Sequence, residues 1–213
     1  MPDTRALNME KRRERILQQA RKMLAGGGLD ALNLRDLAQV SGITVPTIYN
    51  LIGNKSEVLK AVVMGAFAAF EAELDSKLPR PAADMPALMS TTLTAIIAKD
   101  EDAYRATALA GDRLENNPLD PHDYGFKHAP MRQYATMMCH NALDEGLLRG
   151  KIHIDVLVDL MISNHQMAFR DWAHRVISLE ELGKKSLRGF YIALAADATE
   201  DYRDSVVAKQ KEL

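Results

Sequence analysis

The sequence has few of the features that mark secreted, membrane-spanning or metal-binding proteins. Its 213 residues include one cysteine, Cys139, so the chain has no cysteine pair for an internal disulfide or a CxxC site. The N-terminal segment MPDTRALNMEKRRE carries charges where a signal peptide needs an apolar run. The longest stretch without Asp, Glu, Lys or Arg, 37–54, is shorter than the roughly 20 apolar residues of a membrane-spanning helix. These absences predict a cytoplasmic protein.

The sequence also lacks a strong net charge, strand-like patterns and catalytic motifs. The 27 Lys and Arg residues nearly balance the 29 Asp and Glu residues, and this balance alone does not indicate a polyanion binder. No long alternation of β-branched residues predicts a strand. There is no GxSxG, GxGxxG or P-loop motif, and Cys139 has only His140 beside it, which points elsewhere on a helix. We therefore expect an all-α protein that is not an enzyme and uses no cofactor.

Helical periodicity covers most of the chain and predicts about nine helices. The first helix should end at the glycines of 26–28, and Asn33 is placed to cap a short second helix over 34–40. A third short helix should start near Thr44 and end at 53–54, with Pro46 in its first turn. The remaining helices are expected at 55–78, 86–99, 101–115, 127–148, 153–176 and 178–199, with a connection at 116–125.

Charge divides the chain into two parts. Residues 1–60 contain ten Lys and Arg against six Asp and Glu, a net charge of +4. Residues 61–213 contain 17 against 23, a net charge of −6. A basic segment can be solvated surface, so charge alone leaves both a binding and a non-binding interpretation open.

The segment LRDLAQV-SGI-TVPTIYNL has the pattern of a helix-turn-helix unit, whose second helix can enter the major groove of DNA. Apolar residues on both helices and in the turn can close a small core, and Gly42 can adopt the positive φ that the turn needs. The alternative is an ordinary helical hairpin. The core residues expected on this pattern are Leu34, Leu37, Ala38, Ile43 and Ile48.

The first 60 or so residues resemble the N-terminal DNA-binding domain of the tetracycline-repressor (TetR) family. The matching features are Ile-Leu-x-x-Ala in the first helix, Leu-x-x-Arg-x-Leu-Ala, the Ala-x-x-x-Gly-Ile turn, and Thr-Ile-Tyr followed by Lys55. The rest of the chain matches only in being helical. The resemblance implies a three-helix DNA-binding domain over 1–54 and a larger helical ligand-binding and dimerisation domain over 55–213.

The resemblance also implies roles for individual residues. Arg35 would approach a base edge or a phosphate, and Tyr49 and Lys55 would bind phosphates, Lys55 with help from the amide groups that begin the next helix. The chain departs from the family pattern after Tyr49, where it has Asn50-Leu51-Ile52. The expected DNA-binding residues are Arg35, Thr44, Val45, Pro46, Thr47, Tyr49, Asn50 and Lys55.

The turn and the expected recognition helix contain no charged residue. Base discrimination must therefore come from hydroxyl groups and apolar surface, such as methyl groups of Val45 and Thr47 against thymine. The salt-dependent part of the affinity must come from the flanks. The candidates are Arg5, Lys11, Arg12, Arg13, Arg35 and Lys55.

The resemblance implies a pocket for a small-molecule effector in the C-terminal body. Many of the eleven methionines lie there, and their flexible thioethers suit apolar ligands, although plain core packing is the commoner reason for any one of them. The candidate ligand-binding residues are Phe67, Met89, Leu93, Tyr104, Thr107, Met131, Tyr134, Met138, His165, Phe169 and Trp172. All six histidines follow residue 120, but no two are spaced i, i+4 on one helix, so we expect no metal site.

The expected function is a ligand-responsive transcriptional regulator, in this family most often a repressor. It would bind a palindromic operator as a homodimer, formed by the helices at 153–176 and 178–199, and a small apolar or aromatic effector would release it. The alternatives are a helical-bundle enzyme and a helical adaptor that uses the hairpin for protein contacts. The sequence leaves the effector, the operator and the choice between repressor and activator open.

Overall fold

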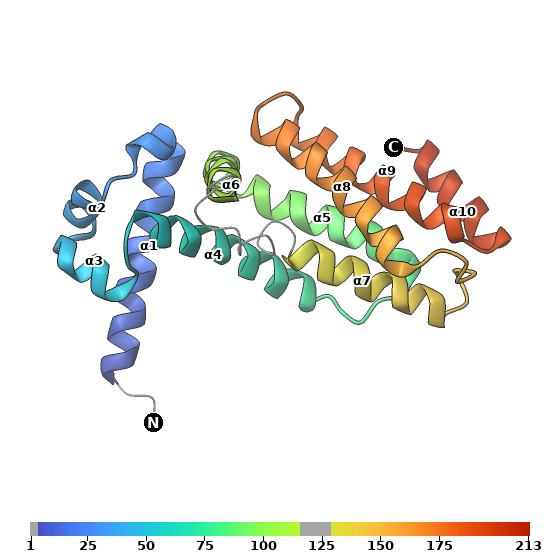
Figure 1. Ribbon diagram of the computed structural model, residues 1–213, viewed down its shortest axis with the longest axis horizontal. Coiled ribbons are helices and arrows are strands. Elements are labelled where there is room, and N and C mark those ends of the chain that lie inside the picture. The colour runs from blue at the N-terminus through green and yellow to red at the C-terminus, as the bar shows by residue number, and fades with distance from the viewer. Residues whose placement is uncertain (1–3, 116–128) are drawn as a thin grey trace. The chain divides into compact units, whose positions relative to one another are not determined.

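The structure, a computed structural model, describes residues 4–115 and 129–213 (Figure 1). These residues form ten α-helices, one 3-10 helix and an isolated bridge between Leu148 and Ala198. The helices are α1 (Thr4–Ala31), α2 (Leu34–Ser41), α3 (Val45–Leu51), α4 (Lys55–Asp75), η1 (Ala82–Asp84), α5 (Met85–Ala98), α6 (Glu101–Glu115), α7 (Ala129–Asp144), α8 (Ile154–Ala173), α9 (Leu179–Asp197) and α10 (Glu200–Lys211).

The all-α prediction is confirmed, and the described residues contain one α-helix more than the nine or so expected. The connection predicted at 116–125 lies outside the described residues, as do the first two residues of the helix predicted at 127–148. None of the described helices combines the length and the apolarity needed to cross a membrane.

The chain forms two compact units. The first consists of Met1–Ala68 and Asp100–Lys127, and the second of Ala69–Lys99 and His128–Leu213. Both units therefore draw on separate stretches of sequence. The predicted division into a DNA-binding domain over 1–54 and a ligand-binding and dimerisation domain over 55–213 concerns the roles of the residues. It stays a prediction.

The glycine run interrupts helix α1 as predicted, although α1 as a whole extends to Ala31. Gly26 and Gly27 continue the helix, whereas Gly28 has φ 67° and ψ −161°, outside the helical region. A glycine adopts this conformation without the steric penalty that a Cβ atom would bring. Gly28 is thus the residue that breaks the regular helix within α1.

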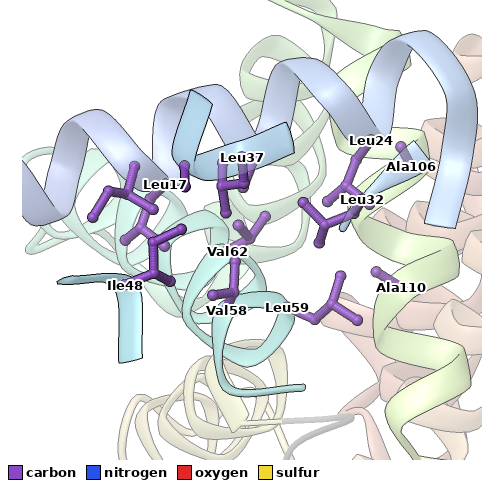
Figure 2. Packing of buried hydrophobic residues seen from close by; sticks show 13 residues of the cluster. Leu17, Leu24, Leu32, Leu37, Ile48, Val58, Leu59, Val62, Ala106 and Ala110 are labelled. Carbon is purple, nitrogen blue, oxygen red and sulfur yellow. The ribbon is translucent and has the colours of Figure 1, made fainter. Parts of the chain in front are cut away.

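A single apolar cluster holds the first unit together. Its side chains come from α1, α2, α3, α4, α6 and the connection between α1 and α2, and Figure 2 shows them pointing toward one another between the ribbons. Leu37, Ala38 and Ile48 are buried in this cluster, and Leu34 and Ile43 pack against it half-buried. The core predicted for the helix-turn-helix segment is confirmed.

In the second unit, α8 and α9 pack closely side by side (Figure 1). A methyl group on Gly189 of α9 would overlap the side chain of Asn164 on α8, so the absence of a side chain allows the close approach. Ser178 and Glu181 form a reciprocal capping box that starts α9. The buried hydroxyl of Ser90 on α5 donates to the carbonyl of Gly183, 3.0 Å away, and links α5 to α9.

Helix α10 is the element that the sequence analysis missed. It is predominantly polar and buries only Tyr202 and Val206, one turn apart. Two apolar residues at this spacing do not produce a recognisable hydrophobic stripe. The helix predicted at 178–199 is consequently not the last helix of the chain.

The buried carboxylate of Asp197 organises the connection between α7 and α8. Its side chain is 1% exposed and accepts hydrogen bonds from the backbone amides of Gly150, Lys151 and Ile152, at 2.8, 2.9 and 3.3 Å. Hydrogen bonds from amides to a charged group are among the stronger ones in proteins. This connection is therefore fixed by one acidic residue more than 40 positions away in sequence.

We expect Asp197→Ala to lower the free energy of unfolding by about 2–4 kcal/mol, because three backbone amides lose their acceptor in a partly buried place. Urea unfolding at a fixed protein concentration measures the change. Asp204→Ala is the matched control, because Asp204 is exposed on α10, and this variant should change stability by less than about 0.5 kcal/mol. Equal effects of the two substitutions would contradict the role assigned to Asp197.

Candidate nucleic-acid interface

The turn between α2 and α3 is fixed by residues at both ends of α2. Asn33 caps the helix, as predicted, by accepting a hydrogen bond from the amide of Asp36 at 2.9 Å. Gly42 ends the helix with φ 64°, in the left-handed region that glycine favours. The amide of Ile43 then donates to the carbonyl of Ala38 at 3.0 Å. These local interactions set the direction in which the chain enters α3.

Helix α3 is anchored on one side and open on the other. Ile48 is completely buried, and Val45 is half-buried against the same core. Thr47 is also half-buried. Part of the Val45 surface therefore serves packing. The residues of this segment with exposed side chains are Thr44, Pro46, Tyr49 and Asn50.

The two threonines at the start of α3 contact each other. Their Oγ1 atoms lie 2.9 Å apart, within hydrogen-bond distance, and either hydroxyl can be the donor. Thr44 occupies the N-cap position of α3, yet its side chain accepts no hydrogen bond from the helix backbone. The amide of Thr47 donates instead to the carbonyl of Thr44, at 3.0 Å.

The cationic candidates nearest to α3 lie at the starts of two other helices. Arg35 is exposed in the first turn of α2. Lys55 is the first residue of α4, also exposed, and its ammonium group donates to the carbonyl of Leu29 at 3.0 Å. Lys55 therefore has a structural contact with the end of α1 in addition to its expected role. An ammonium group has three donor hydrogens, so this contact leaves others for a phosphate.

The amide groups at the start of α4 are less available to a phosphate than the family resemblance implies. The amide of Asn54 donates to the carboxylate of Glu57 at 2.6 Å, and the amide of Glu57 donates to the side-chain oxygen of Asn54 at 3.1 Å. This reciprocal pair satisfies two of the free amides at the helix start and places a negative charge there. A phosphate bound by Lys55 would have to approach away from Glu57.

Further cations lie along α1. Lys11 and Arg12 are exposed. Arg13 is 3.7 Å from the carboxylate of Glu10, a surface ion pair that contributes little to stability. The side chain of Arg5 lies outside the described residues. The cationic candidates thus lie on α1, α2 and α4, and the surface of α3 itself is uncharged.

Three of the predicted ligand-binding residues lie together on α8 in the second unit. The ring centroids of His165 and Phe169 are 5.8 Å apart, and those of Phe169 and Trp172 are 5.2 Å apart. Phe190 of α9 extends this cluster, at 6.3 Å from His165. Nδ1 of His165 lies 2.9 Å from the hydroxyl of Ser186, in the interior. These residues form a packed aromatic cluster between α8 and α9.

A second group lies on one face of α7. Met131, Tyr134 and Met138 are all buried and spaced three and four residues apart. The hydroxyl of Tyr134 donates to the carboxylate of Asp75 at 2.6 Å, and its ring packs edge-on against Phe70 of α4. Burial, followed by the Asp75 carboxylate, raises the pKa of Tyr134, so this hydroxyl stays protonated as a donor.

The remaining predicted ligand residues are divided between the two units. Met89 is fully buried on α5, and Leu93 is half-buried one turn later. Phe67, Tyr104 and Thr107 belong to the first unit. The hydroxyl of Thr107 already donates to the carbonyl of Ala103 at 2.7 Å. Burial is the main cause that raises the pKa of Tyr104.

A surface hollow with a volume of about 590 Å³ lies elsewhere in the second unit. It is formed by α5, α9 and the end of α10, with Leu88, Leu187 and Tyr191 among its apolar lining and Arg80 and Lys209 among its charged residues. None of the predicted ligand-binding residues lines it. Sequence reasoning missed this hollow, because one of its walls is the unpredicted helix α10.

The described residues show no arrangement suited to metal binding, since no three His, Cys, Asp or Glu side chains among them could hold an ion together. His122 and His128 lie outside the described residues. Cys139 is fully buried, and burial raises the pKa of its thiol to about 12. The thiol is therefore protonated at neutral pH and is a poor nucleophile.

Comparison with known proteins identifies the N-terminal segment. Residues 16–62 match the family model described as "Bacterial regulatory proteins, tetR family". This range contains the whole helix-turn-helix and the start of α4. No curated protein sequence matches the chain significantly.

Solved structures of TetR-family regulators share the fold of the chain. SmeT, the repressor of the Stenotrophomonas maltophilia multidrug efflux pump SmeDEF, is 20% identical, with a TM-score of 0.69 over 89% of this chain and 92% of that one. The fatty acid degradation regulator FadR from Bacillus halodurans is 14% identical, with a TM-score of 0.68 over 83% and 92%. A TetR-family transcriptional regulator from Marinobacter aquaeolei is 18% identical, with a TM-score of 0.63 over 94% and 97%.

Identities this low establish the fold and not the ligand or the operator. The family model supplies the independent evidence, because it matches the segment that carries the DNA-binding helices. TetR-family proteins are ligand-responsive transcriptional regulators, usually repressors, and are not in general enzymes. The N-terminal segment of this chain thus matches the TetR family of bacterial regulatory proteins, and the chain as a whole shares the fold of TetR-family transcriptional regulators.

Proposed function

We propose that this protein is a transcriptional repressor that binds a palindromic operator as a homodimer in the cytoplasm and leaves it when a small apolar or aromatic effector binds. Residues 1–54 would contact the DNA, and residues 55–213 would bind the effector and the second subunit. The DNA-binding residues proposed are Arg35, Thr44, Val45, Pro46, Thr47, Tyr49, Asn50 and Lys55.

The exposed, uncharged surface of α3 is the observation that carries this proposal. Ile48 holds one side of the helix in the core, while Pro46, Tyr49 and Asn50 face solvent on the other. Phosphate contacts position a protein on DNA, and contacts to base edges supply its specificity. Cations on α1, α2 and α4 can supply the first kind of contact, and α3 can supply the second.

An unpartnered apolar stripe on α8 and α9 supports the proposed homodimer. Val156, Leu160 and Met167 of α8 are 58%, 52% and 66% exposed, and Ile192 of α9 is 55% exposed. Most other apolar residues of α8 are buried within the unit. A second copy of the chain would cover this stripe, and a symmetric pair of recognition helices would match a palindrome.

The buried residues of the second unit support an apolar or aromatic effector. The aromatic cluster of α8 and the methionines of α7 offer apolar contacts with few polar groups, such as Tyr134 and His165, to orient a ligand. For a nearly complete switch, the effector must bind the DNA-incompetent state more tightly by about 5.5 kcal/mol. A helical adaptor remains the second candidate, and the DNA-binding experiment separates the two.

Selection of binding sequences from a pool of random DNA duplexes tests the proposal. The selected duplex and a scrambled version are then compared in shift assays at two salt concentrations. We expect an enriched palindrome. The affinity of the protein for it should fall as the salt concentration rises, because cationic side chains contact phosphates. If the protein binds no DNA duplex at low salt, the proposed function is wrong and the adaptor is favoured.

The charge of Lys55 can be tested by a substitution that leaves a neutral hydrogen-bond donor at this position. Lys55→Gln keeps a neutral hydrogen-bond donor on a slightly shorter side chain and removes the positive charge. We expect weaker binding to selected and scrambled duplexes alike, with the slope of log affinity against log salt reduced by about 0.9. Lys211→Gln, on α10, is the control with no expected effect. A change in base preference in Lys55→Gln would contradict the phosphate role.

The homodimer is tested by placing a charge in the apolar stripe. The wild-type protein should have twice the 23.7 kDa mass of the chain in light scattering, and Leu160→Asp should have the single mass and bind the palindrome more weakly. Val207→Asp, at a 38% exposed position on α10, should remain dimeric. A monomeric wild-type protein, or a dimeric Leu160→Asp variant with unchanged circular dichroism, would refute this interface.

A further inference from the structure

We infer that the surface hollow formed by α5, α9 and α10 binds a small zwitterion, a molecule that carries an ammonium group and a carboxylate on one apolar body. The hollow has a volume of about 590 Å³, which lies within the range of small-molecule sites in proteins. None of the predicted effector-binding residues lines it. The inference therefore goes beyond the proposed function and concerns a different set of residues.

The walls of the hollow are held in place by contacts within the second unit. The amide of Ala82, at the start of η1, donates to both carboxylate oxygens of Glu145, at 3.0 and 3.1 Å. Ser90 links the buried side of α5 to α9, and Nε of Arg203 on α10 donates to the carbonyl of Ala195 on α9 at 3.2 Å. The hollow is thus preformed, and a preformed site lowers the entropic cost of binding.

Four charged residues of both signs line the hollow without neutralising one another. Arg80 and Lys209 each donate to a backbone carbonyl, at 3.2 and 3.5 Å. Asp84 is the N-cap residue of α5, yet its side chain accepts no hydrogen bond from that helix, and Glu212 is exposed. In the part of the chain that the structure describes, no ion pair joins these four groups. The cations keep donor hydrogens and the carboxylates keep lone pairs for a ligand.

This charge pattern indicates the class of ligand. A ligand with one charge would meet two like charges in the hollow as well as two opposite ones. A zwitterion can present its ammonium group to Asp84 and Glu212 and its carboxylate to Arg80 and Lys209. Charge-assisted hydrogen bonds of this kind are stronger than neutral ones.

Tyr191 supplies a polar group and part of an apolar surface. Its ring lines the hollow together with the half-buried side chains of Leu88 and Leu187. The side chain is only 4% exposed, and its hydroxyl has no hydrogen-bond partner among the described residues. Burial, followed by the carboxylates of Asp84 and Glu212, raises the pKa of Tyr191. Nearly all buried polar groups in proteins are hydrogen-bonded, so this hydroxyl points to a polar ligand group at the wall of the hollow.

Calorimetric titration of the protein without DNA tests the inference with three probes of one shape. The dipeptide leucylphenylalanine carries both charges, its N-acetyl form lacks the ammonium group, and its C-terminal amide lacks the carboxylate. We expect the dipeptide to bind and each modified form to bind about tenfold more weakly, because each loses hydrogen bonds between charged groups. Equal affinity for the dipeptide and either modified form, or no binding of the dipeptide at millimolar concentration, would overturn the inference.

Substitutions assign each end of the probe to its side chains. Asp84→Asn should weaken binding of the dipeptide about tenfold and should not weaken binding of the N-acetyl form, which has no ammonium group. Arg80→Gln should weaken the dipeptide similarly and spare the C-terminal amide. Both residues are exposed, and Asp204→Asn, also exposed but outside the hollow, is the matched control with no expected effect. Loss of affinity for all three probes in Asp84→Asn would contradict the assignment of the ammonium group.

A bulky side chain tests the location. Thr91 is exposed and lines the hollow, so Thr91→Trp should block binding of the dipeptide while leaving circular dichroism unchanged. A folded Thr91→Trp variant that binds the dipeptide as the wild type does would show that another site is used, and the inference would be wrong. These titrations contain no DNA, so their outcome is separate from that of the shift assays that test the proposed function.

Discussion

The burial of Ile48 in the core of the first unit is the contact on which the candidate interface depends. Helix α3 has seven residues, too few to be stable as an isolated helix, so its formation and orientation come from packing. Ile48 is fully buried with Leu37 of α2 and Leu17 of α1 in one cluster (Figure 2). This packing leaves the opposite side of α3 in solvent. The exposed surface that we propose reads DNA is thus a consequence of which residue the helix buries.

The charged residues of the N-terminal part lie outside the recognition segment. The near-neutral total of the chain hides a basic first part and an acidic remainder, and within the basic part the recognition segment itself has no charged residue. Charges on α1, α2 and α4 act over several ångströms, whereas hydroxyl and methyl groups act only in contact. Separating the two kinds of group allows general attraction to DNA and discrimination between bases to be set by different residues. The acidic body would also disfavour approach to DNA by the wrong face.

Local sequence signals predicted the parts of the structure that local interactions determine. Helix α2 begins after Asn33 and ends at Gly42, as expected. A cap and a left-handed turn need particular residue types at particular positions. Interactions between distant residues were not predictable in this way. Asp197 holds the connection before α8, Tyr134 bonds Asp75 at the end of α4, and α10 contributes a wall to the surface hollow. The location of an effector pocket depends on contacts of this second kind, which explains why α3 could be anticipated in more detail than the sensing body.

Protein footprinting by hydroxyl radicals, read by mass spectrometry, tests the central claim that the open side of α3 contacts DNA. Tyr49 is 55% exposed and reactive, and Met64, 45% exposed further along α4, serves as the internal reference. Addition of the selected duplex should slow the oxidation of Tyr49 severalfold and leave the oxidation of Met64 unchanged. An unchanged oxidation rate of Tyr49 at saturating DNA would contradict the account, because DNA would then be bound by another surface.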